Sequence, residues 1–343
     1  MTVGVKLVNQ KDLKDLMEIS YSTPRSNLTT KNGYGHAGFK VAECLTKMGH
    51  RLTYQNPKAK LQINFSQPTN YKLHRNQYQI GYTPWESTVI PELWREKINA
   101  CDEFWTTSQW CKDVYENNGF KVSNVFPHGI DPIWSPKKRE HTNVIKFLHV
   151  GEPAERKGGQ DTVSAFIKAF GNNPNYTLTI KAHKSSVLRV YDREGSILGL
   201  PHEMYSNIKL EERELEDNEM IDMYHQHDVM IYPTYGEGFG FIPFQALATG
   251  MPVISTHEWA DYKKYLGPLK LNSTLIDSPW NVMHPGKVYK PDSNHLVSLI
   301  EDAAVNFRAY SGYYYAQSTE IHKEYNWDQL TNKAFEEVFK KIS

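Results

Sequence analysis

The sequence has few cysteines, no surplus of either charge and no long apolar run. It contains three cysteines in 343 residues, and neither their number nor their spacing suits a disulfide framework or a metal site. Lysine plus arginine number 39, as do aspartate plus glutamate, so no global field draws the chain towards nucleic acid or an anionic membrane. No apolar run approaches the roughly 20 residues that span a bilayer. The N-terminus also lacks an apolar core followed by a cleavage site, so we expect no signal peptide and a cytoplasmic location.

The length and the pattern of elements predict two α/β domains. A chain of 343 residues exceeds the usual size of a single core. Apolar β-rich runs, for example residues 3–8, 79–82 and 144–150, alternate with helical patterns. This rhythm of strand and helix is typical of parallel α/β domains.

One stretch, residues 229–256, carries the strongest pattern. An apolar strand at 229–232 is followed by a glycine turn at 236–240, a helical pattern through 244–248 and a second short strand. A helix that begins just after glycines presents unpaired N–H groups and the positive end of its dipole, which suit a phosphate. Glu237 stands immediately before the glycines, where a carboxylate could meet sugar hydroxyls.

Two further glycine segments precede helical patterns. Residues 32–38 lead into a helix that ends near Gly49, and residues 151–159 follow the strand at 144–150. The second of these contains Lys157 directly before Gly158. Both segments therefore predict further helix N-termini that could face an anion.

The central stretch resembles the nucleotide-sugar site of GT-B glycosyltransferases of the retaining family 4 type. The resemblance rests on Pro233, the sequence Glu-Gly-Phe-Gly at 237–240, a polar residue eight positions after Glu237, and Ala-x-Ala-x-Gly-x-Pro-Val-Ile ending at Ile254. In that family the first carboxylate lies by the transferred sugar and a second usually holds the ribose. Here Gln245 replaces the second carboxylate, and its amide can still accept a hydrogen bond.

The resemblance implies a set of site residues. Lys157 matches a family lysine that contacts the donor diphosphate, whereas Glu152 stands where an arginine is usual, so Arg156 becomes the candidate second cation. The catalytic candidates are Glu237, Lys157 and Arg156. The donor-binding candidates are Gly33, Gly35, Gly236, Gly238, Phe239, Gly240 and Gln245. The candidates for contact with the acceptor or the sugar are Trp85, Glu86 and His128.

The same resemblance implies the architecture. We expect two Rossmann-like domains that face a central cleft, with a last helix that crosses back to the first domain. The predicted limits are 1–131 for the acceptor-side domain, 132–142 for an exposed linker, 143–325 for the nucleotide-sugar domain and 326–343 for the crossing helix.

The expected activity is transfer of a hexosyl or pentosyl group from a nucleoside-diphosphate sugar, most simply UDP- or GDP-linked, to a hydroxyl, with retention. No Asp-x-Asp pair occurs, so we expect no metal and no other cofactor. The acceptor could be a glycan, a glycolipid, a protein or a modified DNA base, and peripheral membrane contact stays open.

Three alternatives remain at this point. The first is a phage-type enzyme that glucosylates hydroxymethylated pyrimidines in DNA, for which the basic run 137–139 and residues 181–189 could contact phosphates. The second is a binding protein that keeps the fold without transferring sugar, and the third is a sugar-nucleotide epimerase. The fold by itself does not separate these functions.

Overall fold

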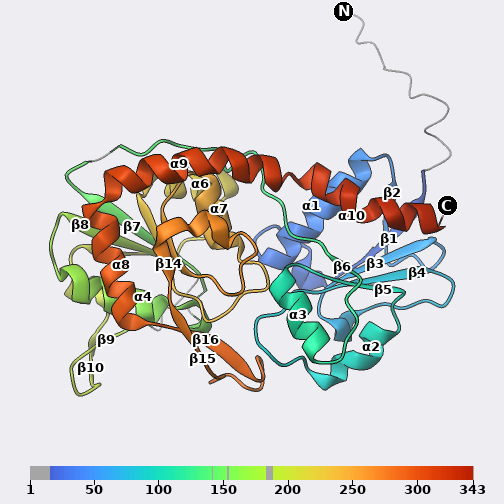
Figure 1. Cartoon of the computed structure of the whole chain (residues 1–343), viewed down its shortest axis with the longest axis horizontal. Helices are drawn as coiled ribbons and strands as arrows, with labels where there is room; N and C mark the ends of the chain where they lie inside the picture. Colours follow the sequence, from blue (N-terminus) through green and yellow to red (C-terminus); the bar gives the residue numbers. More distant parts are fainter. Residues whose placement is uncertain (1–15, 141, 153, 183–187, 343) are drawn as a thin grey trace, which may run out of the picture.

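The structure is a computed structural model that describes residues 16–140, 142–152, 154–182 and 188–342 (Figure 1). Two six-stranded sheets dominate it, with the strand orders β2-β1-β3-β4-β5-β6 and β11-β8-β7-β12-β13-β14. Every pairing within these two sheets is parallel. The predicted fold class, two parallel α/β domains, is therefore confirmed.

The first domain consists of the first sheet and the helices around it. Its strands are β1 (Glu18–Ser22), β2 (Arg51–Tyr54), β3 (Leu61–Phe65), β4 (Tyr78–Tyr82), β5 (Glu103–Thr106) and β6 (Asn124–Val125). Its helices are α1 (Gly33–Lys47), α2 (Arg95–Asn99) and α3 (Gln109–Asn117).

The second domain consists of the second sheet, its helices and two small hairpins. The sheet strands are β7 (Ile145–Val150), β8 (Tyr176–Lys181), β11 (Ile208–Glu211), β12 (Val229–Tyr232), β13 (Val253–Thr256) and β14 (Lys270–Leu271). The hairpins pair β9 (Val190–Tyr191) with β10 (Ile197–Gly199) and β15 (Ser273–Asp277) with β16 (Lys287–Pro291). The helices are α4 (Gly159–Phe170), α5 (Pro201–Met204), α6 (Asp217–Gln226), α7 (Phe241–Ala248), α8 (Ser293–Val305) and α9 (Phe307–Glu324).

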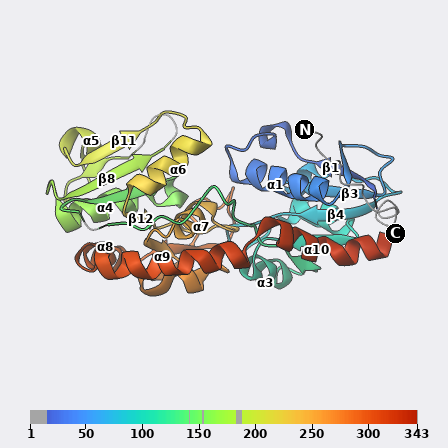
Figure 2. The same ribbon diagram turned by 90° about the horizontal axis from the view of Figure 1, so that it is seen from above.

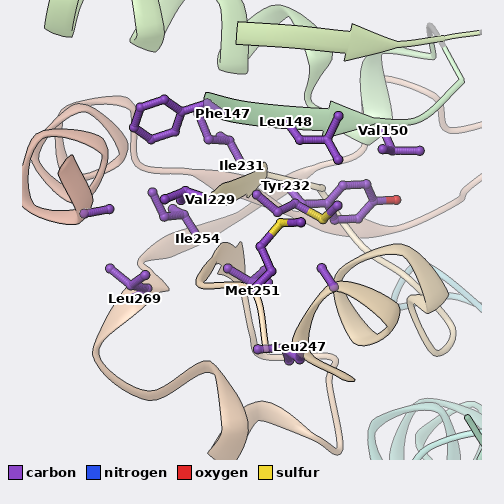
Figure 3. Packing of buried hydrophobic residues seen from close by; sticks show 14 of the residues in the cluster. Phe147, Leu148, Val150, Val229, Ile231, Tyr232, Leu247, Met251, Ile254 and Leu269 are labelled. Carbon is purple, nitrogen blue, oxygen red and sulfur yellow. The ribbon is translucent and has the colours of Figure 1, made fainter. Parts of the chain in front are cut away.

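Burial on both faces explains why the central strands are continuously apolar. Figure 1 shows α6 and α7 on one side of the second sheet and α4 on the other, and β12 and β13 bury every one of their residues. Figure 2 shows α9 running along this domain towards α10. Phe147 and Leu148 of β7 pair in register with Val229 and Met230 of β12. Figure 3 shows the apolar side chains of these strands packed into one core. This core fixes the strand ends from which the site loops project.

The last helix, α10 (Trp327–Ile342), leaves the second domain and packs on the first. Figure 1 shows α9 lying along the second domain and α10 continuing over the first. Phe335 of α10 is 1% exposed, and its ring centre lies 4.9 Å from that of Trp105 in β5. α10 also contacts α1. The predicted crossing of the last helix is thus confirmed, whereas the exact domain limits stay a prediction.

The N-terminal region differs from the expected pattern. The strand predicted at residues 3–8 lies outside the described residues. Strand β1 occupies a stretch that we expected to be polar and irregular, and its Ser20 and Ser22 are buried. Their hydroxyl oxygens accept hydrogen bonds from the Asn56 N–H at 2.8 Å and from Gln62 Nε2 at 2.7 Å. Because serines occupy two of its four buried positions, this strand gives only a weak apolar signal in the sequence.

Other elements also depart from the sequence prediction. The glycines of 33–38 lie inside α1 and not in a turn before it, because the Asn32 side chain accepts the Gly35 N–H at 2.7 Å and caps the helix. The segment 268–291, expected to be irregular, contains β14 and the β15–β16 hairpin. The tyrosine-rich helix α9 has no clear apolar periodicity and was not predicted.

The described residues of the segment 132–142 are mostly exposed, as the sequence predicts for a linker, but two of them are buried. Trp134 is 7% exposed and Arg139 is 6% exposed. The Arg139 guanidinium donates to the carbonyl oxygens of Tyr224 at 2.9 Å and His227 at 2.7 Å, at the end of α6. Carbonyls at a helix C-terminus lack the full set of intrahelical partners, so a basic residue here supplies further donors. Arg139 therefore ties the segment to the second domain.

Candidate active site

A cleft of 960 Å³ lies between the two domains. Its volume falls within the roughly 300–1,000 Å³ of typical small-molecule sites. One wall comes from α1 and the loop after β4, and the other comes from the ends of β7, β8 and β12 and from α6 and α7. The predicted site residues that line it are Gly33, Glu86, His128, Arg156, Lys157, Glu237, Gly238, Phe239, Gly240 and Gln245.

Helix α7 begins where the central glycine segment enters this cleft. The residue before the helix, Gly240, adopts a left-handed φ of 81°, which lets the chain turn sharply into the first helical residue, Phe241. No described side chain caps this helix end. The N–H groups of the first turn, together with the helix dipole, can therefore receive an anion.

Glu237 is held through one of its two carboxylate oxygens. Oε1 receives hydrogen bonds from Lys157 Nζ at 2.7 Å, Tyr232 Oη at 2.9 Å and Thr234 Oγ1 at 3.1 Å. Arg156 Nη1 lies 3.5 Å from the same oxygen. Among the described residues no partner is recorded for Oε2. The carboxylate is thus fixed in position while one oxygen keeps its lone pairs for a ligand.

The surroundings of Glu237 also fix its charge. The residue is 7% exposed, and burial by itself would raise the pKa of its carboxyl group. The positive charges of Lys157 and Arg156 outweigh this effect and lower the pKa to about 2. Glu237 is therefore a carboxylate at any physiological pH, suited to orienting hydroxyls and unsuited to carrying a proton.

Arg156 lies at the junction between the domains. Its Nη1 donates to the Gly236 carbonyl oxygen, and its Nη2 is 3.9 Å from Glu86 Oε1 of the first domain. Burial would lower the pKa of the guanidinium, but the carboxylates of Glu237 and Glu86 raise it above its usual value. The guanidinium contacts these protein groups and also lines the cleft, and its role as the second phosphate cation stays a prediction. In this geometry it holds the turn that carries Glu237.

Two glycines of the central motif are required by the contact between the domains. A Cβ atom on Gly236 would lie 2.3 Å from the Glu86 carbonyl oxygen, and one on Gly238 would lie 2.3 Å from Pro84 Cβ. Thr107 Oγ1 also donates to the Gly238 carbonyl at 2.7 Å across the same junction. Their small size lets the first-domain loop after β4 approach this turn, in addition to any role in phosphate binding.

Gly35, Gly236 and Trp85 do not line the cleft. Gly35 packs against the preceding segment, where a Cβ atom would lie 1.6 Å from the Thr29 carbonyl oxygen. Trp85 is 3% exposed, donates its indole N–H to the Val89 carbonyl at 2.9 Å and packs on Trp94. The structure therefore gives Gly35 and Trp85 packing roles where the sequence suggested donor and acceptor contacts.

His128 reaches the cleft but is almost completely covered. It is 3% exposed, and its ring stacks on Phe241 at 4.7 Å with an interplanar angle of 5°. Its Nδ1 lies 3.2 Å from Tyr82 Oη. Burial, with a smaller contribution from His36, lowers the pKa of His128 to about 3. His128 is therefore a neutral imidazole set between aromatic rings.

The cleft also contains polar residues that the sequence analysis did not single out. His36 Nε2 lies 3.0 Å from Asp131 Oδ2, and Lys40 Nζ lies 2.5 Å from Asp131 Oδ1. Burial would raise the pKa of Asp131, but hydrogen bonds from His36 and Lys40 lower it. His36 and Lys40 stand four positions apart in α1, a spacing that places them on one helix face and could have revealed them. Lys181, at the end of β8, lines the opposite wall.

The basic run 137–139 does not form a free cationic patch. Lys137 Nζ donates to the His225 carbonyl at 2.9 Å, and Arg139 is buried as described above. Protein groups thus engage two of the three cations in one of the two basic segments on which the DNA-modifying alternative depended.

The described part of the chain is expected to bind no metal. Within it, no group of three His, Cys, Asp or Glu side chains is arranged to hold a metal ion. No helix there is both long and apolar enough to cross a bilayer.

Comparison with known proteins matches the second domain to a family and the whole chain to a fold. Residues 144–264 match the family described as glycosyl transferases group 1. A protein named glycosyltransferase 45, from Sulfolobus islandicus filamentous virus (isolate Iceland/Hveragerdi), is 22% identical over 81% of this chain and 82% of its own length.

Solved structures agree with this fold. Sucrose-phosphate synthase from Thermosynechococcus elongatus aligns with a TM-score of 0.67 at 12% identity, over 95% of this chain and 100% of its own. HepE from Anabaena, determined in complex with UDP, aligns with a TM-score of 0.63 at 11% identity, over 94% of this chain and 99% of its own. The fold is therefore that of the GT-B glycosyltransferases. With the family match and the viral relative, it identifies the chain as a glycosyltransferase in which residues 144–264 are similar to the group 1 family.

Proposed function

We propose that this enzyme transfers a sugar from a nucleoside-diphosphate sugar to a hydroxyl acceptor, with retention of the anomeric configuration and without a metal ion. UDP and GDP are the first nucleotides to consider, and HepE, which was determined in complex with UDP, makes UDP the first to test.

The observation that carries this proposal is the geometry of Glu237. Its Oε1 is saturated by protein donors, whereas Oε2 has no recorded partner among the described residues. The pair of hydroxyls on a sugar ring matches a fixed carboxylate oxygen with free lone pairs. Glu237 also stands three residues before Gly240, so a sugar bound here would have its phosphate near the N-terminus of α7.

The same region supplies the charges that a diphosphate leaving group requires. The N–H groups at the start of α7 and the ammonium of Lys157 converge on this end of the cleft. They can stabilise the negative charge that develops as the bond between sugar and phosphate lengthens. Gln245, which lines the cleft from α7, is placed to hydrogen bond the ribose. These groups would make a metal ion unnecessary.

Retention is proposed from the resemblance to the family 4 type. The bond between the sugar C1 and the donor phosphate oxygen breaks, and a bond from C1 to the acceptor oxygen forms on the same face. The acceptor proton passes to an oxygen of the leaving phosphate, so the protein supplies position and charge only. The low pKa of Glu237, about 2, agrees with this division because it makes the carboxylate a weak base.

Location and acceptor are the least constrained parts of the proposal. Cys44, Cys101 and Cys111 are free thiols, which suits a reducing cytoplasm. Acceptor recognition would fall to the first-domain wall of the cleft.

A nucleotide screen tests the proposed function. Thermal shift and donor hydrolysis would be measured with UDP, GDP and ADP and with their common sugar conjugates. The proteins compared are the wild-type chain, Glu237→Gln and the control Glu301→Gln, at an exposed position of α8. We expect one nucleotide to raise the melting temperature and its sugar to be hydrolysed slowly. We also expect hydrolysis to fall by roughly 100-fold in Glu237→Gln alone. Absence of stabilisation by every nucleotide would contradict the phosphate-site assignment.

A further inference from the structure

We infer that His36, positioned by Asp131, accepts a hydrogen bond from the acceptor hydroxyl and orients it for transfer. The inference rests on the proposed function and adds a residue to its acceptor side.

The contact with Asp131 determines which nitrogen of His36 is free. Asp131 is a buried carboxylate that accepts through Oδ2 from His36 Nε2, at 3.0 Å, and through Oδ1 from Lys40 Nζ, at 2.5 Å. A carboxylate cannot donate, so Nε2 carries the proton and neutral His36 has a bare lone pair on Nδ1. No described residue is recorded in a hydrogen bond with Nδ1. The side chain is 19% exposed and lines the cleft, so this lone pair is available to a hydroxyl.

His36 stands next to the proposed donor site. Its ring centre lies 5.2 Å from that of Phe241, the first residue of α7. A Cβ atom on Gly33, one turn earlier in α1, would lie 3.7 Å from the same phenyl ring. This face of α1 therefore adjoins the helix end at which the diphosphate is expected. An acceptor hydroxyl must reach the sugar carbon beside that diphosphate, so it must come close to His36.

Three other titratable side chains of the first-domain wall face cations or are covered. Glu86 faces Arg156 and His284, each at 3.9 Å. Glu43 binds Lys40 at 3.0 Å. His128 has only 3% of its surface exposed. His36 thus combines an acceptor atom that has no recorded partner among the described residues with exposed surface, beside the proposed donor site.

The neighbouring surface indicates suitable probes. Phe39 is 45% exposed and Ile133 is 51% exposed, and both line the cleft near the His36 and Asp131 pair. An acceptor that joins a hydroxylated ring to an apolar group would contact both features. The p-nitrophenyl glycosides of glucose, galactose, mannose and N-acetylglucosamine have this form.

The experiment compares His36→Phe, His36→Gln and Asp131→Asn with the control Lys47→Gln, which removes an exposed charge on the same helix. Transfer from each nucleotide sugar to each p-nitrophenyl glycoside would be measured beside hydrolysis of the same donor. We expect His36→Phe to lower kcat/KM for the acceptor roughly 30-fold, whereas Lys47→Gln should leave both transfer and donor hydrolysis within about twofold of wild type. His36→Gln should recover part of the loss because its amide oxygen can accept, and Asp131→Asn should fall between them.

A second measurement does not need an acceptor. The ¹⁵N chemical shifts of the His36 ring, assigned by comparison with His36→Gln, report which nitrogen carries the proton. A bare Nδ1 in the wild-type chain at neutral pH supports the inference, and a protonated Nδ1 overturns it. Equal acceptor kcat/KM in His36→Phe and Lys47→Gln would also overturn it. Failure of the wild-type chain to hydrolyse any nucleotide sugar would instead contradict the proposed function.

Discussion

At the scale of single residues, this site depends on how Glu237 is held. Three hydrogen bonds and a nearby guanidinium converge on Oε1. Because Oε1 is fixed, the orientation of the carboxylate and the position of Oε2 are fixed as well. The carboxylate is therefore a rigid orienting group, and its neighbours should affect turnover through its position more than through direct contact with the donor.

Tyr232→Phe tests this view. It removes the 2.9 Å hydrogen bond to Glu237 without changing the shape of the core. We expect donor hydrolysis to fall roughly tenfold and the free energy of unfolding to fall by about 1–2 kcal/mol, with the nucleotide Kd unchanged. Tyr115→Phe is the matched control, because the Tyr115 hydroxyl is buried without a hydrogen-bond partner and lies away from the cleft. An altered nucleotide Kd with normal hydrolysis in Tyr232→Phe would contradict the proposed role of Glu237.

Lys157 and Arg156, the two cations beside Glu237, should differ in how strongly their removal weakens nucleotide binding. Lys157 contacts Glu237 alone among recorded partners, whereas Arg156 is also held by Gly236 and faces Glu86. We expect Lys157→Ala to weaken nucleotide binding at least tenfold, roughly the effect of one charge-assisted hydrogen bond. Arg156→Ala should weaken it less and slow hydrolysis more. Titration calorimetry measures nucleotide binding and the hydrolysis assay measures turnover, with Lys168→Ala, at an exposed position of α4, as the control. A larger loss of binding in Arg156→Ala than in Lys157→Ala would support the second-cation hypothesis.

At the scale of elements, the crossing helix α10 joins a domain from which it is separated in sequence. Its apolar face completes the core of the first domain, with Trp327, Phe335 and Val338 all buried there. The helix is thus both the end of the second domain's chain and a structural part of the first, so its packing couples the two domains.

Phe335→Ala measures that coupling. The ring packs between Trp105 and Phe126, at 4.9 Å and 6.0 Å between ring centres. Its removal leaves a cavity and should lower the free energy of unfolding by about 3–5 kcal/mol. Val305→Ala on α8, at a position that is 82% exposed, should change it by less than about 0.5 kcal/mol. Chemical denaturation checks both values, and a small loss in Phe335→Ala would show that α10 is dispensable for the first-domain core.

At the scale of the whole molecule, buried imidazoles make the stability depend on pH. His149 donates from Nδ1 to the Ile231 carbonyl at 2.9 Å, and burial lowers its pKa to about 4. His128, as described above, is also kept neutral by burial. In the unfolded chain both would titrate near 6.5. Below pH 6.5 these histidines bind protons in the unfolded chain but stay neutral in the folded chain. Their contribution to the free energy of unfolding is therefore greatest above pH 6.5 and falls as the pH decreases towards 4.

His149→Gln tests the sign of this effect. The amide can still donate to the Ile231 carbonyl but does not titrate. We expect the loss of stability between pH 7.5 and pH 5, measured by urea denaturation, to be smaller in this variant than in the wild type. The control His202→Gln, at an exposed histidine, should lose as much stability over this pH range as the wild type. An identical pH dependence in His149→Gln and the wild type would contradict the assignment.

The sequence by itself determined the elements whose chemistry is local. The strand, glycine turn and helix from Val229 to Ala248 were predicted with nearly the observed limits, because an apolar strand, a glycine that accepts a left-handed φ and a helical pattern are each encoded in adjacent residues. Glu237 and Lys157 were predicted for the same reason, since each belongs to a short motif. The fold class followed from the alternation of strands and helices.

Only the tertiary structure decided which of these residues meet and which are covered. The sequence could not show that Trp85 packs inside the first domain, that Arg139 is buried, or that Arg156 is shared between two domains, because each depends on contacts between distant segments. The pairing of His36 with Asp131 joins α1 to the segment after β6 in the same way. Local patterns specify strands, turns and helices, whereas burial and the partners of a charged group are properties of the packed chain.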